Sequence, residues 1–257
     1  IRGRFSLRAD SIVTQGARFS VLSASAVNDD STWLVRLGTS PDDRPGGETS
    51  GSVSLRADTV AIAIDSLLVR IPGSELELQR PTRIRFDTSG TIVVDTVELR
   101  GTRGALLQLA GVVRDTGAIA VSLTVSNVPV PFAGTRGMGD SVKTRVDAQV
   151  SVGGTAREPL ATLRSRVRLI EADSVSLDSI IGEVTHERGT TRLKVTAHGE
   201  NRGLFLVQAT GPTALSLSPF KAELPDDSIT GEIAIDSLYL PSVTRLIPGI
   251  HASAGVL

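Results

Sequence analysis

Apolar and polar residues alternate along most of the chain. In the segment LRSRVRL, which starts at residue 163, Leu163, Val167 and Leu169 lie on one side of an extended chain and three arginines lie on the other. A period of two is typical of a strand that buries one face. Such segments recur at roughly the 8–12-residue spacing of an all-β protein. The clearest further examples are residues 117–125, 146–152 and 192–198.

Helical patterning is almost absent. Only PSVTRLI (241–247) is expected to form a helix, of two turns at most, because proline stands at its first-turn position. Stretches rich in glycine, proline and polar residues predict loops or linkers near 38–51, 127–141 and 211–227. We interpret residues 1–257 as a single elongated β-repeat region cut from a longer protein. The chain starts at Ile1 without an initiator methionine and ends in what resembles the start of a strand.

One phrase is written twice: GRFSLRADSI at residues 3–12 and GSVSLRADTV at residues 51–60. Each copy contains an aspartate, a serine or threonine and an aliphatic residue in succession. The apolar phase of the alternation changes at several of these pairs. Around Asp65, for example, Val60, Ile62 and Ile64 precede the pair with one parity, and the following apolar residues have the other. The motif begins at Asp10, Asp58, Asp65, Asp95, Asp140, Asp173, Asp178, Asp227 and Asp236.

Two successive polar residues cannot both point away from the buried face of a flat strand. The chain is therefore expected to bulge, bend or turn at each Asp-Ser/Thr pair, so that the apolar residues return to the same face. Both side chains can bond to nearby backbone groups, which would stabilise such irregularities. We interpret the pairs as structural markers and not as catalytic carboxylate–hydroxyl pairs.

The apolar residues are mostly aliphatic. The chain is 40% hydrophobic but has one Trp, one Tyr and six Phe. With so little helix to cover them, the strands must form either a two-sheet sandwich or one curved sheet around an apolar interior. The few aromatic residues favour an aliphatic trough that holds acyl chains. The predicted lining consists of Val60, Ile62, Ile64, Ile92, Val94, Ile119, Val121, Leu123, Val125, Val167, Leu169, Leu193, Val195, Ile233 and Ile235.

Little in the sequence supports catalysis. The absence of cysteine excludes thiol catalysis, cysteine-ligated zinc, iron–sulfur clusters and disulfides. No G-x-S-x-G, H-E-x-x-H or phosphate-loop motif is present. His186 and His198 are expected to be solvated, and the net charge of −1 gives no basic field for nucleic acid. We therefore predict no enzyme activity, catalytic residue, metal or cofactor.

From residue 50 onward the chain resembles the repeats of the TamB family (translocation and assembly module proteins) within the AsmA-like group. That family shows a Gly-Thr step, a Pro-Leu step and a later Ala-x-Gly-x-x-x-x-Leu segment. Thr162 stands where a glycine often follows Pro-Leu. The segment GEIAIDSLYLPSVTRLIPGIHASAG (231–255) is similar to the family's inter-repeat segment. The matching repeat positions are Gly154, Thr155, Pro159, Leu160, Ala209, Gly211 and Leu215.

The resemblance implies a curved, β-taco-like sheet in a periplasmic, inner-membrane-anchored protein of a diderm bacterium. Such a protein bridges the cell envelope, passes phospholipids towards the outer membrane, and supports outer-membrane assembly with a barrel partner. The alternative is a structural or adhesive β-solenoid of a secreted passenger protein. The chain has only three asparagines, too few for stacked asparagine ladders. Flanking membrane-helix and repeat sequence would favour the bridge, whereas a signal peptide and an autotransporter barrel would favour the passenger.

Overall fold

The computed structural model confirms an all-β protein. The described part contains eighteen strands, one 3-10 turn and no α-helix. Sixteen antiparallel strands form one curved sheet, and β16 and β17 pair separately. The structure describes residues 3–14, 17–29, 31–40, 46–71, 74–114, 117–131, 143–171, 177–199, 204–217, 220–223 and 229–236.

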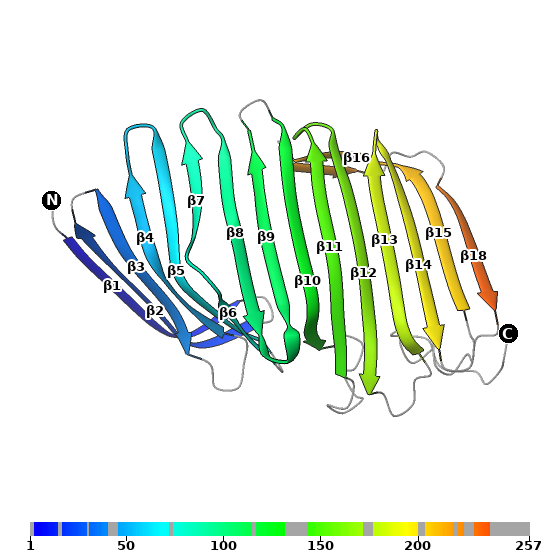
Figure 1. The fold of residues 1–257 in the computed structure, drawn as a ribbon, viewed down its shortest axis with the longest axis horizontal. Coiled ribbons are helices and arrows are strands. Elements are labelled where there is room, and N and C mark those ends of the chain that lie inside the picture. Colours follow the sequence, from blue (N-terminus) through cyan, green and yellow to red (C-terminus); the bar gives the residue numbers. More distant parts are fainter. Residues whose placement is uncertain are drawn as a thin grey trace. The chain divides into compact units, whose positions relative to one another are not determined.

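The chain divides into two compact units, residues 1–126 (unit 1) and 127–257 (unit 2). In unit 1, successive strands pair as antiparallel neighbours, except that β6 and β7 both lie between β5 and β8 (Figure 1). The unit contains β1 (Gly3–Thr14), β2 (Ala17–Asp29), β3 (Thr32–Ser40), β4 (Gly46–Leu55), β5 (Thr59–Ile71), β6 (Ser74–Leu78), β7 (Thr82–Asp87), β8 (Ile92–Gly101), the 3-10 turn η1 (Thr102–Gly104), β9 (Leu106–Val113) and most of β10 (Ile119–Pro131).

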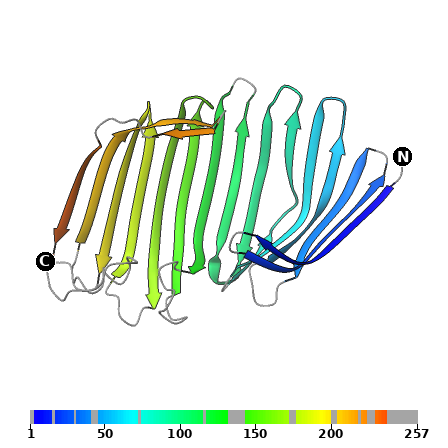
Figure 2. The ribbon, with the colours of Figure 1, turned by 180° about the vertical axis from the view of Figure 1, so that it is seen from behind.

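Unit 2 continues the same antiparallel arrangement. Its strands β11 to β15 pair in chain order, and β18 pairs with β15. The β16–β17 hairpin lies crosswise at the ends of these strands, behind them in Figure 1 and in front of them in Figure 2. The elements are β11 (Lys143–Gly154), β12 (Pro159–Glu171), β13 (Leu177–Glu187), β14 (Thr190–Gly199), β15 (Leu204–Pro212), β16 (Ala214–Leu217), β17 (Phe220–Glu223) and β18 (Thr230–Asp236).

The segments that alternate most clearly are strands, namely β10, β11, β12 and β14. The loop predictions were partly wrong. Strands occupy both ends of 38–51, the start of 127–141 and much of 211–227. Polar, glycine-rich sequence can still pair when a neighbouring strand supplies backbone partners, as β5 does for Gly47 of β4. The predicted helix at 241–247 lies outside the described residues.

The phase changes at Asp65 and Asp95 are β-bulges, as predicted. Ser50 and Gly51 of β4 pair with Ser66 and Ile64, so Asp65 is the extra residue on β5. On β8, Asp95 and Thr96 together oppose a single residue of β9. Each bulge returns the following apolar residues to the face used before it, which is the outcome that the alternation predicted.

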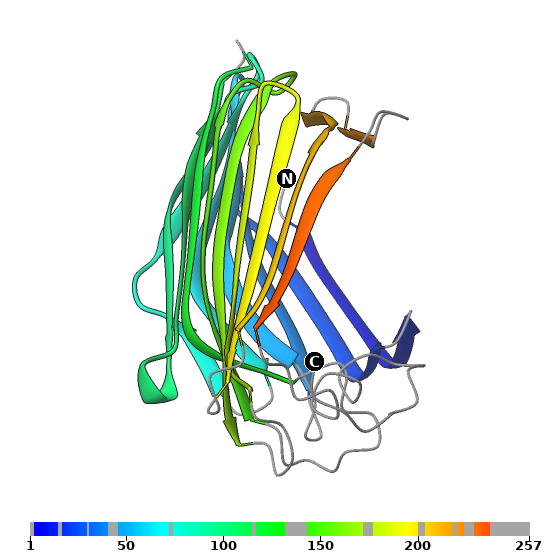
Figure 3. The ribbon, with the colours of Figure 1, turned by 90° about the vertical axis from the view of Figure 1, so that its right-hand side faces the viewer.

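The irregularities of unit 1 lie at one level across the sheet. Ile64, the last residue before the Asp65 bulge, pairs with Thr82, the first residue of β7. The interruption between β6 and β7 (79–81) and the Asp95 bulge are at the same level, since the Thr82 hydroxyl donates to the Asp95 carbonyl (3.2 Å). Aligned bulges bend a sheet. Figure 3 shows strands β5 to β8 changing direction along their length.

The other Asp-Ser/Thr pairs do not all have this role. Asp178 is a bulge between β13 and β14, because Leu177 and Ser179 pair with consecutive residues. Asp236 is the last residue of β18 and pairs with Leu204. Asp140, Asp173 and Asp227 lie outside the described residues.

The twice-written phrase occupies two different structural contexts, and the expected bulge, bend or turn is absent at Asp10 of the first copy. The first copy lies wholly within β1, and the pairing with β2 keeps one register through Asp10. The second copy ends β4, turns at Asp58 and begins β5; the Arg56 amide donates to the Thr59 carbonyl (2.9 Å) across that turn. Strand partners distinguish the two contexts: the first copy pairs with β2 along its length, whereas the second pairs with β5 as far as Leu55 and then turns.

The polar side chains at the bulges bond across strands instead of to their own backbone. Asp95 pairs with Arg85 of β7 (3.2 Å). The Ser66 hydroxyl lies 2.7 Å from the Ser50 hydroxyl of β4. An aspartate does hold a turn locally elsewhere. In the β7–β8 turn, hydrogen bonds from the Ser89 hydroxyl and the Thr91 amide lower the pKa of the Asp87 carboxyl.

Gly51, opposite the Asp65 bulge, is required by close backbone approach. A Cβ atom on Gly51 would lie 2.0 Å from the Ala63 carbonyl oxygen. We expect Gly51→Ala to lower the free energy of unfolding by about 1–3 kcal/mol in urea denaturation, because the two strands must separate. Gly3→Ala is the matched control, since no atom lies within 4 Å of its added Cβ. Equal stability of the two variants would contradict the close approach.

Candidate functional site

Each unit presents one sheet face that is predominantly apolar. Paired residues of an antiparallel ladder share a face, and successive residues alternate between faces. The register therefore assigns the described side chains in the strands of unit 1 to a face. We call one of these the unit-1 apolar face, which carries Phe5, Leu7, Trp33, Val35, Leu37, Val53, Leu55, Val60, Ile62, Ile64, Leu67, Val69, Ile71, Leu76, Leu78, Ile84, Phe86, Ile92, Val94, Val97, Leu99, Leu107, Leu109, Val113, Ile119, Val121, Leu123 and Val125.

The nine lining residues predicted in unit 1 all belong to this face. Ile62 of β5 pairs with Ile84 of β7, which pairs with Val94 of β8. The ladder continues through β9 to Val121 of β10. The nine residues are Val60, Ile62, Ile64, Ile92, Val94, Ile119, Val121, Leu123 and Val125.

Burial on the unit-1 apolar face is uneven. Leu76, Val97 and Leu99 lie beside the bend and are buried. Phe5 and Leu37, on the outer strands β1 and β3, are exposed. A bent sheet brings the side chains of its inner face together, so burial beside the bend indicates that the apolar face is the inner one.

The unit-2 apolar face is assigned in the same way. Val167 of β12 pairs with Val146 and Ile180, and Val195 of β14 pairs with Gly182 and Val207. The register pairs Leu169 with Thr144 and Ile235 with Phe205. The unit-2 apolar face carries Val146, Val150, Val152, Pro159, Leu163, Val167, Ile180, Val184, Leu193, Val195, Ala197, Phe205, Val207 and Ile233.

Much of the unit-2 apolar face is accessible. Leu193 is 36% exposed and Ile233 is 67% exposed. Val195 and Val207, which lie between them in the sheet, are half-buried, and Ala197, farther along β14, is buried. Contiguous accessible apolar side chains are unusual on a soluble surface and mark binding sites. The predicted lining residues with described side chains thus occupy one surface in each unit.

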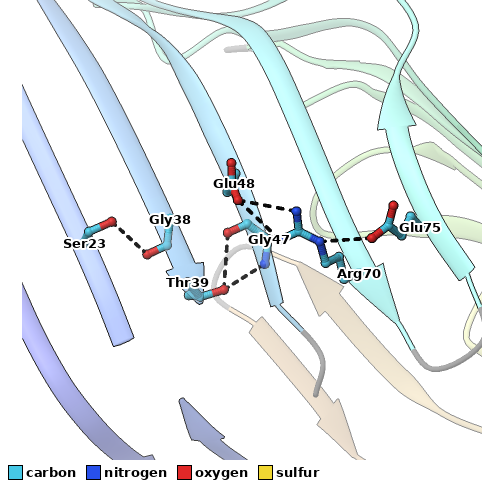
Figure 4. Close-up of polar contacts among 7 residues, drawn as sticks. All are labelled: Ser23, Gly38, Thr39, Gly47, Glu48, Arg70 and Glu75. Atoms are coloured by element: carbon cyan, nitrogen blue, oxygen red, sulfur yellow. Dashed lines mark hydrogen bonds and ion pairs between the residues drawn. The ribbon is translucent and has the colours of Figure 1, made fainter. Parts of the chain in front are cut away.

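The opposite faces carry charged residues. Across β4, β5 and β6, Arg70 lies between Glu48 (3.3 Å) and Glu75 (3.1 Å), as Figure 4 shows. In unit 2, Arg168 pairs with Asp147 (2.9 Å) and Arg164 with Glu183 (3.6 Å). The arginines that alternate along β12 are therefore on the polar face, as predicted, and such exposed pairs contribute little to stability.

Hydroxyl groups close the β3–β4 connection next to this charged cluster. The Gly47 amide donates to the Thr39 hydroxyl oxygen (2.8 Å), and the Ser23 hydroxyl donates to the Gly38 carbonyl (3.3 Å; Figure 4). These bonds link β2 to β3 and β3 to β4 within unit 1.

The prediction of a solvated His186 was wrong. His186 is only 6% exposed, and its Nδ1 lies 2.9 Å from the Thr191 hydroxyl and 3.1 Å from the Thr213 hydroxyl. The sequence places His186 beside the turn residues Arg188 and Gly189, which do form a turn with positive φ. One of these hydroxyl partners, Thr213, is 27 residues away in the sequence. His198 is exposed on β14, as predicted.

The described residues include no group of three or more histidine, aspartate or glutamate side chains that could hold a metal ion. Over the same residues, no helix has the length and apolarity of a membrane span. Comparison of the chain with protein-family models, curated proteins and solved structures gives no match. The two apolar faces therefore remain the candidate site on physical grounds.

Burial beside the bend predicts the effect of truncating Leu99. We expect Leu99→Ala to lower the free energy of unfolding by about 2–3 kcal/mol, because apolar contacts are lost and a cavity forms. Leu34→Ala is the control, since Leu34 lies on the polar face and is exposed; its change should stay within about 0.5 kcal/mol. Urea denaturation followed by circular dichroism measures both. Similar losses would show that the two faces are equally packed.

Proposed function

We propose that this chain is a segment of an inner-membrane-anchored bridge protein that spans the periplasm. Its apolar sheet faces bind phospholipid acyl chains and conduct them towards the outer membrane, in support of outer-membrane assembly with a barrel protein as partner. The main support for the proposal is that, in each unit, aliphatic residues from successive strands lie together on one accessible face.

The chemistry of the face fits acyl chains better than a folded partner. Aliphatic side chains give non-directional apolar contact, which suits ligands of variable length and unsaturation. Covering apolar surface is worth roughly 25 cal/mol per Å². An acyl chain that covers Leu193, Val195 and Val207 removes their side chains from water without needing a polar partner. The charged opposite face keeps the sheet hydrated.

The first test is analysis of bound lipid. The chain is expressed in the periplasm of a diderm bacterium, purified without detergent, extracted with organic solvent and analysed by mass spectrometry. We expect phospholipid to be recovered with the protein. A lipid-free protein that also takes up no phospholipid from vesicles would contradict the proposal.

The second test concerns transfer. Donor vesicles carrying a fluorescent phospholipid are mixed with acceptor vesicles, and the rate of fluorescence exchange is measured with and without the protein. We expect the protein to raise this rate. Binding without transfer would limit the role to lipid binding. If the protein showed no binding and no transfer, the result would favour the structural passenger protein.

A further inference from the structure

Strands β16 and β17 are an excursion between two strands that are already neighbours. β15 and β18 pair in antiparallel register, with Thr210 opposite Thr230. A two-residue turn can join strands that are paired in this way. The intervening residues are therefore not needed to continue the sheet. They form the β16–β17 hairpin instead.

Hydrogen bonds hold the hairpin across the turn ends of β11 to β14. The Leu217 amide and the Ser216 hydroxyl both donate to the Ala156 carbonyl, at 2.7 and 3.2 Å, in the turn between β11 and β12. The Thr213 amide donates to the Gly189 carbonyl (2.8 Å) in the turn between β13 and β14. Figures 1 and 2 show the hairpin lying across these strand ends.

Burial shows which face the hairpin covers. Pro159 lies on the unit-2 apolar face and is less than 2% exposed, whereas the next residue, Leu160, points to the polar face and is 46% exposed. Adjacent strand residues face opposite sides, so the cover lies over the apolar face. Farther from the hairpin, Leu193 and Ile233 on the same face are exposed.

A partly buried polar cluster, centred on the buried His186, lies at the base of the hairpin. Thr213 follows the last residue of β15, and its hydroxyl lies 2.6 Å from the Thr191 hydroxyl and 3.1 Å from His186 Nδ1. Buried polar groups are costly unless they are paired. Moving the hairpin away would remove Thr213 from this cluster, so the cluster favours the covered arrangement.

We propose that the β16–β17 hairpin is a barrier that closes the unit-2 apolar face at the β11–β14 turn ends. An acyl chain on this face is thereby confined to the region of Leu193, Val195 and Val207. It enters and leaves across the strands and not over the turns. This inference rests on the proposed function, and its test separates the two.

The test uses three single-cysteine variants, since the chain contains no cysteine of its own. Leu193→Cys reports on the accessible part of the unit-2 apolar face. Ala161→Cys reports on the same face beside Pro159, and Leu160→Cys on the polar face. Each variant is labelled with bimane and incubated with phosphatidylcholine vesicles that carry a nitroxide on the acyl chain. The vesicles are then removed and quenching is measured.

We expect quenching at Leu193→Cys to exceed that at Ala161→Cys about threefold. Leu193 is exposed, whereas Ala161 lies only about 7 Å along β12 from the buried Pro159, on the same face. Leu160→Cys should not be quenched. Equal quenching at Leu193→Cys and Ala161→Cys would overturn the barrier but leave lipid binding intact. No quenching at Leu193→Cys would overturn the proposed function and the barrier together.

A hairpin-deletion variant provides the second arm. Replacing residues 212–228 with Asn-Gly joins β15 to β18 by a tight turn. We expect quenching at Ala161→Cys to rise about threefold in this variant, to the level at Leu193→Cys, because the cover is gone. Unchanged quenching in a variant that keeps its β-sheet circular dichroism would overturn the barrier. Should the variant not fold, the comparison in the intact chain still decides.

Discussion

Leu193→Glu is expected to lower the phospholipid bound per protein by at least about tenfold, equivalent to about 1.4 kcal/mol of binding free energy. The carboxylate would lie among Val184, Val195 and Ala209 on the unit-2 apolar face, where an acyl chain would strip it of water. Quantitative mass spectrometry of extracted lipid measures the effect. Folding should persist, because Leu193 is already partly exposed.

Leu160→Glu is the matched control for this prediction. It makes the same substitution at a position of similar exposure, but on the polar face of β12, which is separated from β14 by β13. Its bound lipid should equal that of the parent chain. Equal losses in the two variants would show that lipid binding does not distinguish the faces. A charge reversal at Arg166, also on the polar face, should likewise leave lipid binding unchanged.

Deletion of Asp65 is expected to have the largest effect on stability, more than about 4 kcal/mol, a loss that point substitutions rarely reach. Removing the extra residue removes the bulge. Leu67, Val69 and Ile71 can then keep their register with β4 and β6 only if the preceding half of β5 shifts out of its own register with β4. A one-residue slip sends a whole apolar set to the opposite face. Urea denaturation measures the loss.

Asp65→Asn separates the bulge from the carboxylate. It keeps the number of residues and therefore the register, and Asp65 is exposed. Its stability should stay within about 0.5 kcal/mol of the parent chain. A large loss in Asp65→Asn would assign the effect to the charge, whereas a small loss in the deletion variant would show that β5 tolerates the other register.

The alternation of apolar and polar residues was sufficient to predict the faces. Strand geometry alone places Val60, Ile62 and Ile64 on the same side of the strand. The phase change at Asp65 follows from the need to keep one face apolar. The predicted lining could therefore be grouped correctly without any knowledge of strand partners.

Local sequence was not sufficient to predict the structure where distant residues set the pairing or the burial of a segment. The two copies of SLRAD differ in structure because one pairs throughout with β2 and the other reaches a turn. His186 is buried because Thr213, on a segment that returns from β15, lies against it. The segment 38–51 pairs at both ends because its first residues belong to β3, between β2 and β4, and its last residues belong to β4, between β3 and β5.

The sequence by itself determined that the fold is all-β, that one face of the sheet is aliphatic, and that bulges keep this face apolar. These features depend on the two-residue period of an extended chain, which is local. Only the tertiary structure decided that the irregularities at Gly51, Asp65 and Asp95 align into one bend, and that the β16–β17 hairpin covers one end of an apolar face. These depend on which strands become neighbours, and backbone pairing between distant segments sets that.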